Sequence, residues 1–121
     1  MPGGDQRRQV GADGEAAVAQ WYVAAGYEVV AANWRVRDGE LDLVVQQSGT
    51  LVFCEVKTRR SDRFGLPIEA ITPRKQQRLR LLASRFLESN HVRYRALRFD
   101  VASVVPDTAG GWTVTVLEHA F

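Results

Sequence analysis

The chain has 121 residues, of which 45% are hydrophobic, and it carries a formal net charge of +2. This length supports one globular domain, which buries roughly two-thirds of the surface of its unfolded chain. No apolar run approaches the roughly 20 residues of a membrane span, and the polar N-terminus has no apolar signal core. Cys54 is the single cysteine, which excludes an internal disulfide. A cytoplasmic protein with no membrane partner is therefore expected.

The first elements in chain order are a tail, a helix and a strand. Residues 1–9 are expected to form a flexible tail, and residues 10–121 a single domain. A helical pattern covers about residues 10–25 and ends at Gly26, a natural stop. Residues 27–33 are predicted to be a strand. One face of this helix carries Ala17, Trp21, Ala24 and Ala25.

The next two strands form a hairpin and are the most informative part of the chain. Residues 39–45 and 53–57 are short, apolar and rich in β-branched side chains, and residues 47–50 between them are turn-prone. Antiparallel pairing across that turn gives one entirely apolar face. The other face becomes charged at the open end, where Asp42 lies opposite Glu55, and Glu40 opposite Lys57. A slip of one residue would move every charge into the core, so this register is well constrained.

The register places the Asp42 and Glu55 carboxylates side by side, with Cβ atoms about 5 Å apart. Like charges at that separation are destabilising unless they are neutralised, which a divalent cation would do. Lys57 lies on the same face, roughly 7 Å along the strand from Glu55. Two acidic oxygen donors beside an ammonium are typical of metal-assisted phosphodiester cleavage. Spacing alone leaves open a surface hairpin with a Glu40–Lys57 pair and solvated carboxylates.

The rest of the chain adds a helix and two strands. Thr72 and Pro73 are typical of an N-cap and a first helical position, and the helix is expected to end near residue 88. Its core-facing stripe consists of Leu79, Leu82, Ala83 and Phe86. Strands are predicted over residues 96–105 and 112–117. The order predicts an α/β fold with a central mixed β-sheet of about five strands flanked by helices.

Several further charged residues are candidates for function. Glu15 either complements the helix dipole, lies on a solvated face, or brings a third carboxylate to the hairpin. Asp100 on an inner strand is expected to pair with Arg98. Only two of the sixteen basic residues are lysines, Lys57 and Lys75. The candidates for nucleic-acid contact are Arg59, Arg60, Arg63, Arg74, Lys75 and Arg78. The alternative for each of them is a solvated basic surface.

Taken together, these residues resemble the PD-(D/E)XK nuclease superfamily, and more closely the YraN-type family of small bacterial predicted endonucleases. Archaeal Holliday-junction resolvases look similar in fold and motif order. The resemblance covers about residues 10–105. It rests on the stretches Gly-Glu-Ala-Ala at 14–17, Asn-Trp-Arg at 33–35, Gly-Glu-Leu-Asp-Leu at 39–43, Phe-Cys-Glu-Val-Lys-Thr-Arg at 53–59, Phe-Gly at 64–65, Lys75 and Arg-Phe-Asp-Val at 98–101.

The resemblance implies a restriction-endonuclease-like core of order αβββαβ. It implies that Glu15, Asp42 and Glu55 bind metal, with the Val56 carbonyl as a further candidate ligand. Lys57 would orient the attacking water or stabilise the transition state. Leu41 stands where the superfamily name has proline, a position that varies across the superfamily.

The resemblance also implies a Mg²⁺- or Mn²⁺-dependent endonuclease that hydrolyses phosphodiester bonds of DNA, branched DNA included, in repair or recombination. DNA is favoured over RNA as the partner, and a homodimer is expected from the junction-cutting relatives. The alternative is a non-catalytic nucleic-acid-binding module with the same fold. A third reading is an adaptor whose apolar patches bind a protein partner.

Overall fold

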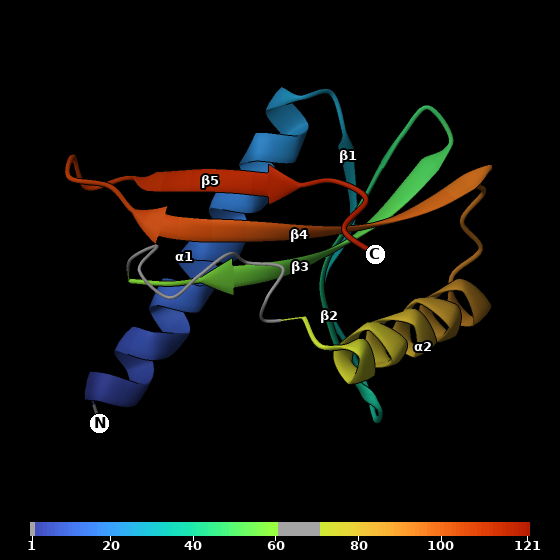
Figure 1. The fold of residues 1–121 in the computed structure, drawn as a ribbon, viewed down its shortest axis with the longest axis horizontal. Helices are drawn as coiled ribbons and strands as arrows, with labels where there is room; N and C mark the ends of the chain where they lie inside the picture. The colour runs from blue at the N-terminus through green and yellow to red at the C-terminus, as the bar shows by residue number, and fades with distance from the viewer. Residues whose placement is uncertain (1, 61–70) are drawn as a thin grey trace.

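A mixed five-stranded sheet forms the centre of the molecule, in spatial order β1-β2-β3-β4-β5 (Figure 1). The computed structural model describes residues 2–60 and 71–121, and within these ranges the side chains from residue 12 onward. The strands are β1 (Glu28–Val36), β2 (Gly39–Gln47), β3 (Thr50–Thr58), β4 (Ala96–Pro106) and β5 (Trp112–Leu117). Helices α1 (Pro2–Ala24) and α2 (Pro73–Ser89) pack on opposite faces of the sheet.

The strand connections follow the expected order. Strands β1, β2 and β3 form an antiparallel meander, and β4 lies parallel to β3. Helix α2 lies in the connection between these two parallel strands, as a crossover requires. Strand β5 pairs antiparallel with β4 at the sheet edge. The predicted α/β fold, with the αβββαβ core of the restriction-endonuclease-like architecture, is confirmed.

Helix α1 is most deeply buried along a row of residues beside the face that the sequence pattern indicates. Its contact row is Gly14, Val18 and Tyr22, and Val18 and Tyr22 are fully buried. Of the four residues that share the face named from the sequence, Ala17 and Trp21 are half-buried against the core, whereas Ala24 and Ala25 are exposed. Residues at i, i+4 and i+8 share a helix face, but glycine and tyrosine in this row do not look like a core stripe. The helix also begins at Pro2, within the expected tail.

Helix α2 is built as its sequence predicts. The Thr72 hydroxyl accepts a hydrogen bond from the Lys75 main-chain N–H at 3.1 Å, and Pro73 occupies the first turn. The apolar stripe of the helix is buried against β2, β3 and β4. Its four members are Leu79, Leu82, Ala83 and Phe86. Within the described ranges, neither helix is long and apolar enough to cross a membrane.

A buried carboxylate joins the two ends of the chain. Asp100 is fully buried and is bound by the Arg98 guanidinium at 2.8 and 2.9 Å, which confirms the expected ion pair. The Tyr22 hydroxyl donates to Asp100 at 2.6 Å, and the His119 main-chain N–H donates at 3.0 Å. One side chain thus connects α1, β4 and the segment that follows β5. A network with all of its polar atoms paired fixes the position of α1 on the sheet.

Candidate metal centre

Strands β2 and β3 separate at their open end. The hairpin register is confirmed from Gln47–Thr50 to Leu43–Cys54, where the ladder ends. The predicted ladder pairs Asp42–Glu55 and Glu40–Lys57 are not formed. Beyond Leu43, β2 stays paired with β1 as far as Gly39, whereas β3 stays paired with β4 through Thr58. We call the region between residues 39–42 and residues 55–58 the fork.

Asp42 bridges the two strands where the ladder has ended. Its carboxylate accepts a hydrogen bond from the Val56 main-chain N–H at 2.9 Å. Val56 therefore does take part in the site through its nitrogen. A role for the Val56 carbonyl as a metal ligand stays a prediction.

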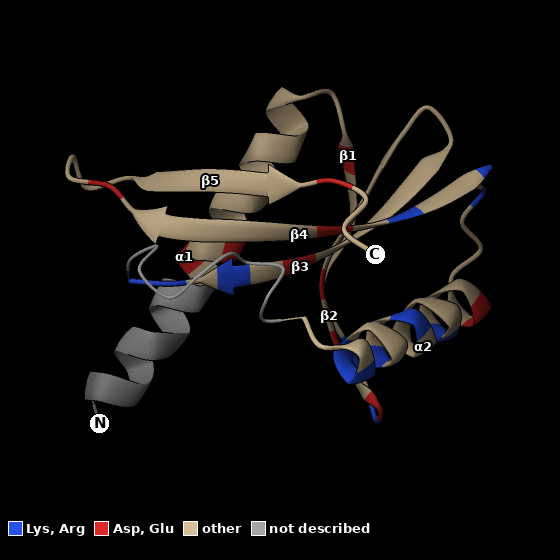
Figure 2. Ribbon diagram, in the orientation of Figure 1, with Lys and Arg blue, Asp and Glu red and all other residues tan. Residues whose placement is uncertain are grey.

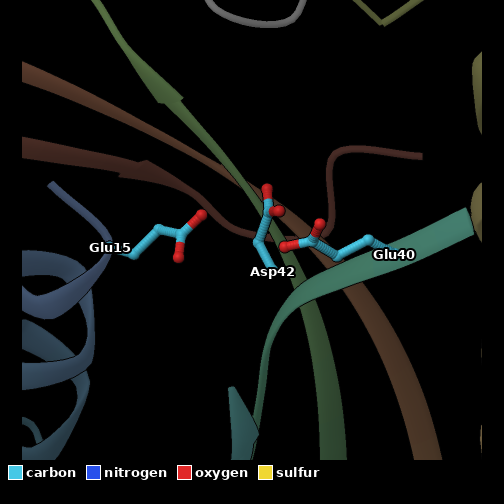
Figure 3. Close-up of side chains that lie close together, drawn as sticks. All are labelled: Glu15, Glu40 and Asp42. Carbon is cyan, nitrogen blue, oxygen red and sulfur yellow. The ribbon is translucent and has the colours of Figure 1, made fainter. Parts of the chain in front are cut away.

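An acidic cluster lies at the fork. Oxygen atoms of Glu15, Glu40 and Asp42 all lie within 4.8 Å of one another, and each residue is half-buried. Figure 3 shows Glu15 reaching from α1 toward Asp42 and Glu40 on β2. The cluster includes two of the predicted metal ligands, Glu15 and Asp42.

Glu40 is the member that the sequence analysis did not propose. The hairpin register predicts a pair with Lys57, but the Glu40 carboxylate instead lies 3.2 Å from the Arg35 side chain on β1. The signal was present in the sequence, because Glu40 and Asp42 are two residues apart and side chains at i and i+2 share a strand face. The predicted pairing with Lys57 obscured it.

Two neighbours bring Glu15 to the cluster. A methyl group built on Gly14 would overlap the Thr58 hydroxyl, so glycine is what allows α1 to lie this close to the end of β3. The side chain of Asn33 on β1 hydrogen-bonds Glu15. Asn33 adopts a positive φ of 52°, a conformation that asparagine tolerates better than most residues. The helix-dipole role considered for Glu15 is wrong, because α1 begins at Pro2 and Glu15 lies well inside the helix.

The carboxylates at the fork raise one another's proton affinity. Burial, together with the charges of Glu55, Glu15 and Glu40, raises the pKa of Asp42 from 3.8 to about 7, although the Val56 hydrogen bond opposes the shift. Burial also raises the pKa of Glu15, and the Asn33 hydrogen bond opposes the shift. Loss of the proton from these carboxylates is therefore unfavourable without a nearby positive charge, which a bound cation would supply.

Glu55 lies beside the cluster and is held by cations. Its Oε1 atom is 3.7 Å from Lys57 Nζ and 3.1 Å from Lys75 Nζ, and its side chain is 11% exposed. The charge of Glu55 also raises the pKa of Asp42, so the two predicted partners do lie near each other. Burial lowers the pKa of Lys57, and the neighbouring Lys75 lowers it further.

Basic residues lie on two elements near the fork, at the end of β3 and on α2 (Figure 2). Arg59 directly follows β3 and donates its main-chain N–H to Val104 at 2.9 Å, and Arg60 is exposed. Arg74 and Arg78 are exposed on α2, whereas Lys75 turns to Glu55. Arg63 lies outside the described residues. Contact of this surface with nucleic acid stays a prediction.

Comparison with known proteins gives one consistent family. The model of "Uncharacterised protein family UPF0102" matches residues 14–104, which include the whole fork. A UPF0102 protein of Symbiobacterium thermophilum is 46% identical over 94% of this chain and 97% of its own length. UPF0102 proteins of Beutenbergia cavernae and Corynebacterium efficiens are 50% and 48% identical, over 84% and 94% of this chain and 86% and 90% of their own lengths. The chain therefore belongs to the UPF0102 family, which is the YraN-type family that its motifs resemble.

Proposed function

We propose that this protein is a metal-dependent nuclease that hydrolyses phosphodiester bonds of DNA at the fork. The observation that carries the proposal is the convergence of three carboxylates, Glu15, Glu40 and Asp42, beside the Glu55–Lys57 pair. Such an arrangement combines a site for a hard cation with a fixed positive charge for a phosphate.

The donor atoms of the fork suit Mg²⁺ or Mn²⁺. All three clustered ligands are carboxylate oxygens, the donor type these ions prefer. Burial first, and then the neighbouring carboxylates, raise the pKa of Asp42, so its charged form is disfavoured unless a cation is bound. Glu15, Glu40 and Asp42 would therefore hold the cation. The chemistry that a bound Mg²⁺ or Mn²⁺ supplies is Lewis-acid activation of water and neutralisation of phosphate charge.

The chain's own cation adds to that chemistry. Lys57 projects from β3 at the edge of the cluster and is 28% exposed, so its ammonium is accessible to a substrate phosphate. A positive charge held at this point stabilises the negative charge that develops during hydrolysis. Arg59 and Arg60 continue from the same strand and would bind flanking phosphates. Branched DNA as the preferred substrate, and a homodimer as the active form, stay predictions from the family resemblance.

A cleavage assay tests the proposal. Purified protein is incubated with branched, duplex and single-stranded DNA and with RNA, with and without Mn²⁺. Cleavage of DNA is expected only with the metal, and Asp42→Asn and Lys57→Ala are expected to abolish it. Glu88→Gln is the matched control, because it removes an exposed carboxylate on α2 that pairs only with Arg85 among the described residues.

A non-catalytic nucleic-acid-binding module would give a different result in this assay. Tight, metal-independent binding of branched DNA with no cleavage of any substrate would overturn the nuclease proposal. That result would favour the non-catalytic nucleic-acid-binding module. Binding of neither DNA nor RNA would contradict both.

A further inference from the structure

Both lysines of the chain meet at one oxygen atom. Lys57 lies on β3 and Lys75 lies in the first turn of α2, so the two lysines come from elements that are separate in the sequence. Their Nζ atoms lie 3.7 and 3.1 Å from the same atom, Glu55 Oε1. Apart from two histidines, every other basic side chain of the chain is an arginine. The two ammonium groups thus lie together at the Glu55 carboxylate, beside the acidic cluster.

Lys75 differs from the other basic residues at the start of α2. Arg74 and Arg78 are exposed, whereas the Lys75 side chain is 31% exposed and pairs with a nearly buried carboxylate. Its main-chain N–H is bound by the Thr72 cap, so the first turn of the helix fixes the backbone from which the ammonium extends. This placement argues against a general role in the basic surface.

We propose that Lys75 is a positioning residue of the active site, which holds Glu55 so that Lys57 stays free for the substrate phosphate. The inference rests on the proposed function. Lys75 makes the shorter contact with Glu55, and Lys57 makes the longer one. Without Lys75, only the Lys57 ammonium of this pair would remain to neutralise the Glu55 carboxylate. It would then close on that carboxylate and turn away from the substrate.

The division of roles predicts opposite effects on metal binding and on turnover. Lys75 places a positive charge near the acidic cluster and so weakens its attraction for a cation. Removal of this charge is expected to tighten Mn²⁺ binding about three- to tenfold. The same change misplaces Lys57 and is expected to lower kcat about ten- to a hundredfold, with little change in KM. A lysine with a merely structural role would weaken both properties when removed.

The test compares Lys75→Met, Lys75→Arg and wild type. Met keeps the aliphatic length without the charge, and Arg keeps the charge. Mn²⁺ affinity is measured by isothermal titration calorimetry, which needs no substrate, and turnover is measured on the DNA that the wild type cuts. Arg85→Ala is the control, because it removes a cation of α2 that pairs with Asp38 and Glu88. We expect tighter Mn²⁺ binding and slower turnover in Lys75→Met only, and near wild-type values for Lys75→Arg and Arg85→Ala.

The outcomes separate this inference from the proposed function. Wild-type protein that binds Mn²⁺, with Lys75→Met binding it equally or more weakly, would overturn the role of Lys75 alone. Unchanged turnover in Lys75→Met would do the same. Failure of the wild type to bind Mn²⁺ would overturn the proposed metal centre, and the inference with it.

Discussion

The Asp42 carboxylate accepts a hydrogen bond from the Val56 main-chain N–H, on the strand from which β2 has just separated. The same carboxylate lies in the cluster with Glu15 and Glu40. Asp42 thus has two opposite effects on the stability of the fork. Its oxygen holds the fork together, while its charge destabilises the fork in the absence of a cation.

Asp42→Asn separates these roles. Asparagine keeps a carbonyl oxygen that can accept from Val56 and removes one charge from the cluster. At pH 8 we expect the metal-free variant to be more stable than wild type by ~0.5–1 kcal/mol, as measured by urea denaturation. Asp42→Ala, which loses the acceptor as well, should gain less or lose stability. A less stable Asp42→Asn would mean that cationic neighbours hold this carboxylate as a structural group.

The stability difference should depend on pH. The folded-state pKa of Asp42, about 7, lies above its ordinary value of 3.8, so the folded protein binds more protons than the unfolded chain between these values. The contribution of Asp42 to stability is therefore full below pH 4 and falls as the pH rises toward 7. The gain from Asp42→Asn should be larger at pH 8 than at pH 5. An equal gain at both values would contradict the raised pKa.

Gly14→Ala tests how closely α1 must approach β3. Alanine favours a helix interior by roughly 1 kcal/mol, but here its methyl group would overlap the Thr58 side chain. We expect a net loss of stability of about 1–3 kcal/mol, together with weaker Mn²⁺ binding as Glu15 moves away. Adding Thr58→Ala removes the overlapping hydroxyl and should restore most of both losses. A Gly14→Ala variant more stable than wild type would show that the contact relaxes at no cost.

The buried Asp100 network predicts a large effect on stability. Asp100→Ala leaves the Arg98 guanidinium without its main partner and is expected to cost about 3–5 kcal/mol in urea denaturation. Tyr22→Phe removes one hydrogen bond to the same carboxylate and should cost less, about 1.5–3 kcal/mol. The reverse order of these two losses would contradict the central place of Asp100.

The basic residues beside the fork predict salt-dependent binding to nucleic acid. Phosphate contacts release counterions, so the logarithm of the affinity should fall linearly with the logarithm of salt concentration. The double variant Arg59→Glu, Arg60→Glu should bind more weakly and show a smaller slope in a fluorescence anisotropy titration. Affinity that is the same at low and high salt would indicate a partner other than nucleic acid.

Much of this fold follows from local sequence patterns. The capped start of α2, its apolar stripe and the hairpin register from Leu43 to Cys54 are predictable because each depends on neighbouring residues. The separation of β2 from β3 was not predictable in this way. It results from competition, because β1 holds one strand and β4 holds the other.

The candidate site shows the same division between local and distant contacts. Asp42, Glu55 and Lys57 were found from spacing along two adjacent strands. The place of Glu40 in the cluster depends on the fork, and the contact of Lys75 with Glu55 depends on how α2 packs against the sheet. Glu15 lies in the cluster because Gly14 allows α1 to pack closely against Thr58 at the end of β3. Contacts between elements distant in sequence are set by tertiary packing.

A crystal structure with Mn²⁺ tests the central claim most directly. Crystals grown or soaked with Mn²⁺ are measured above the manganese absorption edge, and the anomalous difference map locates the ion. We predict a peak in the fork that is ligated by Asp42 together with Glu15 and Glu40, and no such peak in crystals of Asp42→Asn. A map with no peak at the fork, or with Mn²⁺ bound only at exposed carboxylates elsewhere, would contradict the assignment of the fork as a metal centre.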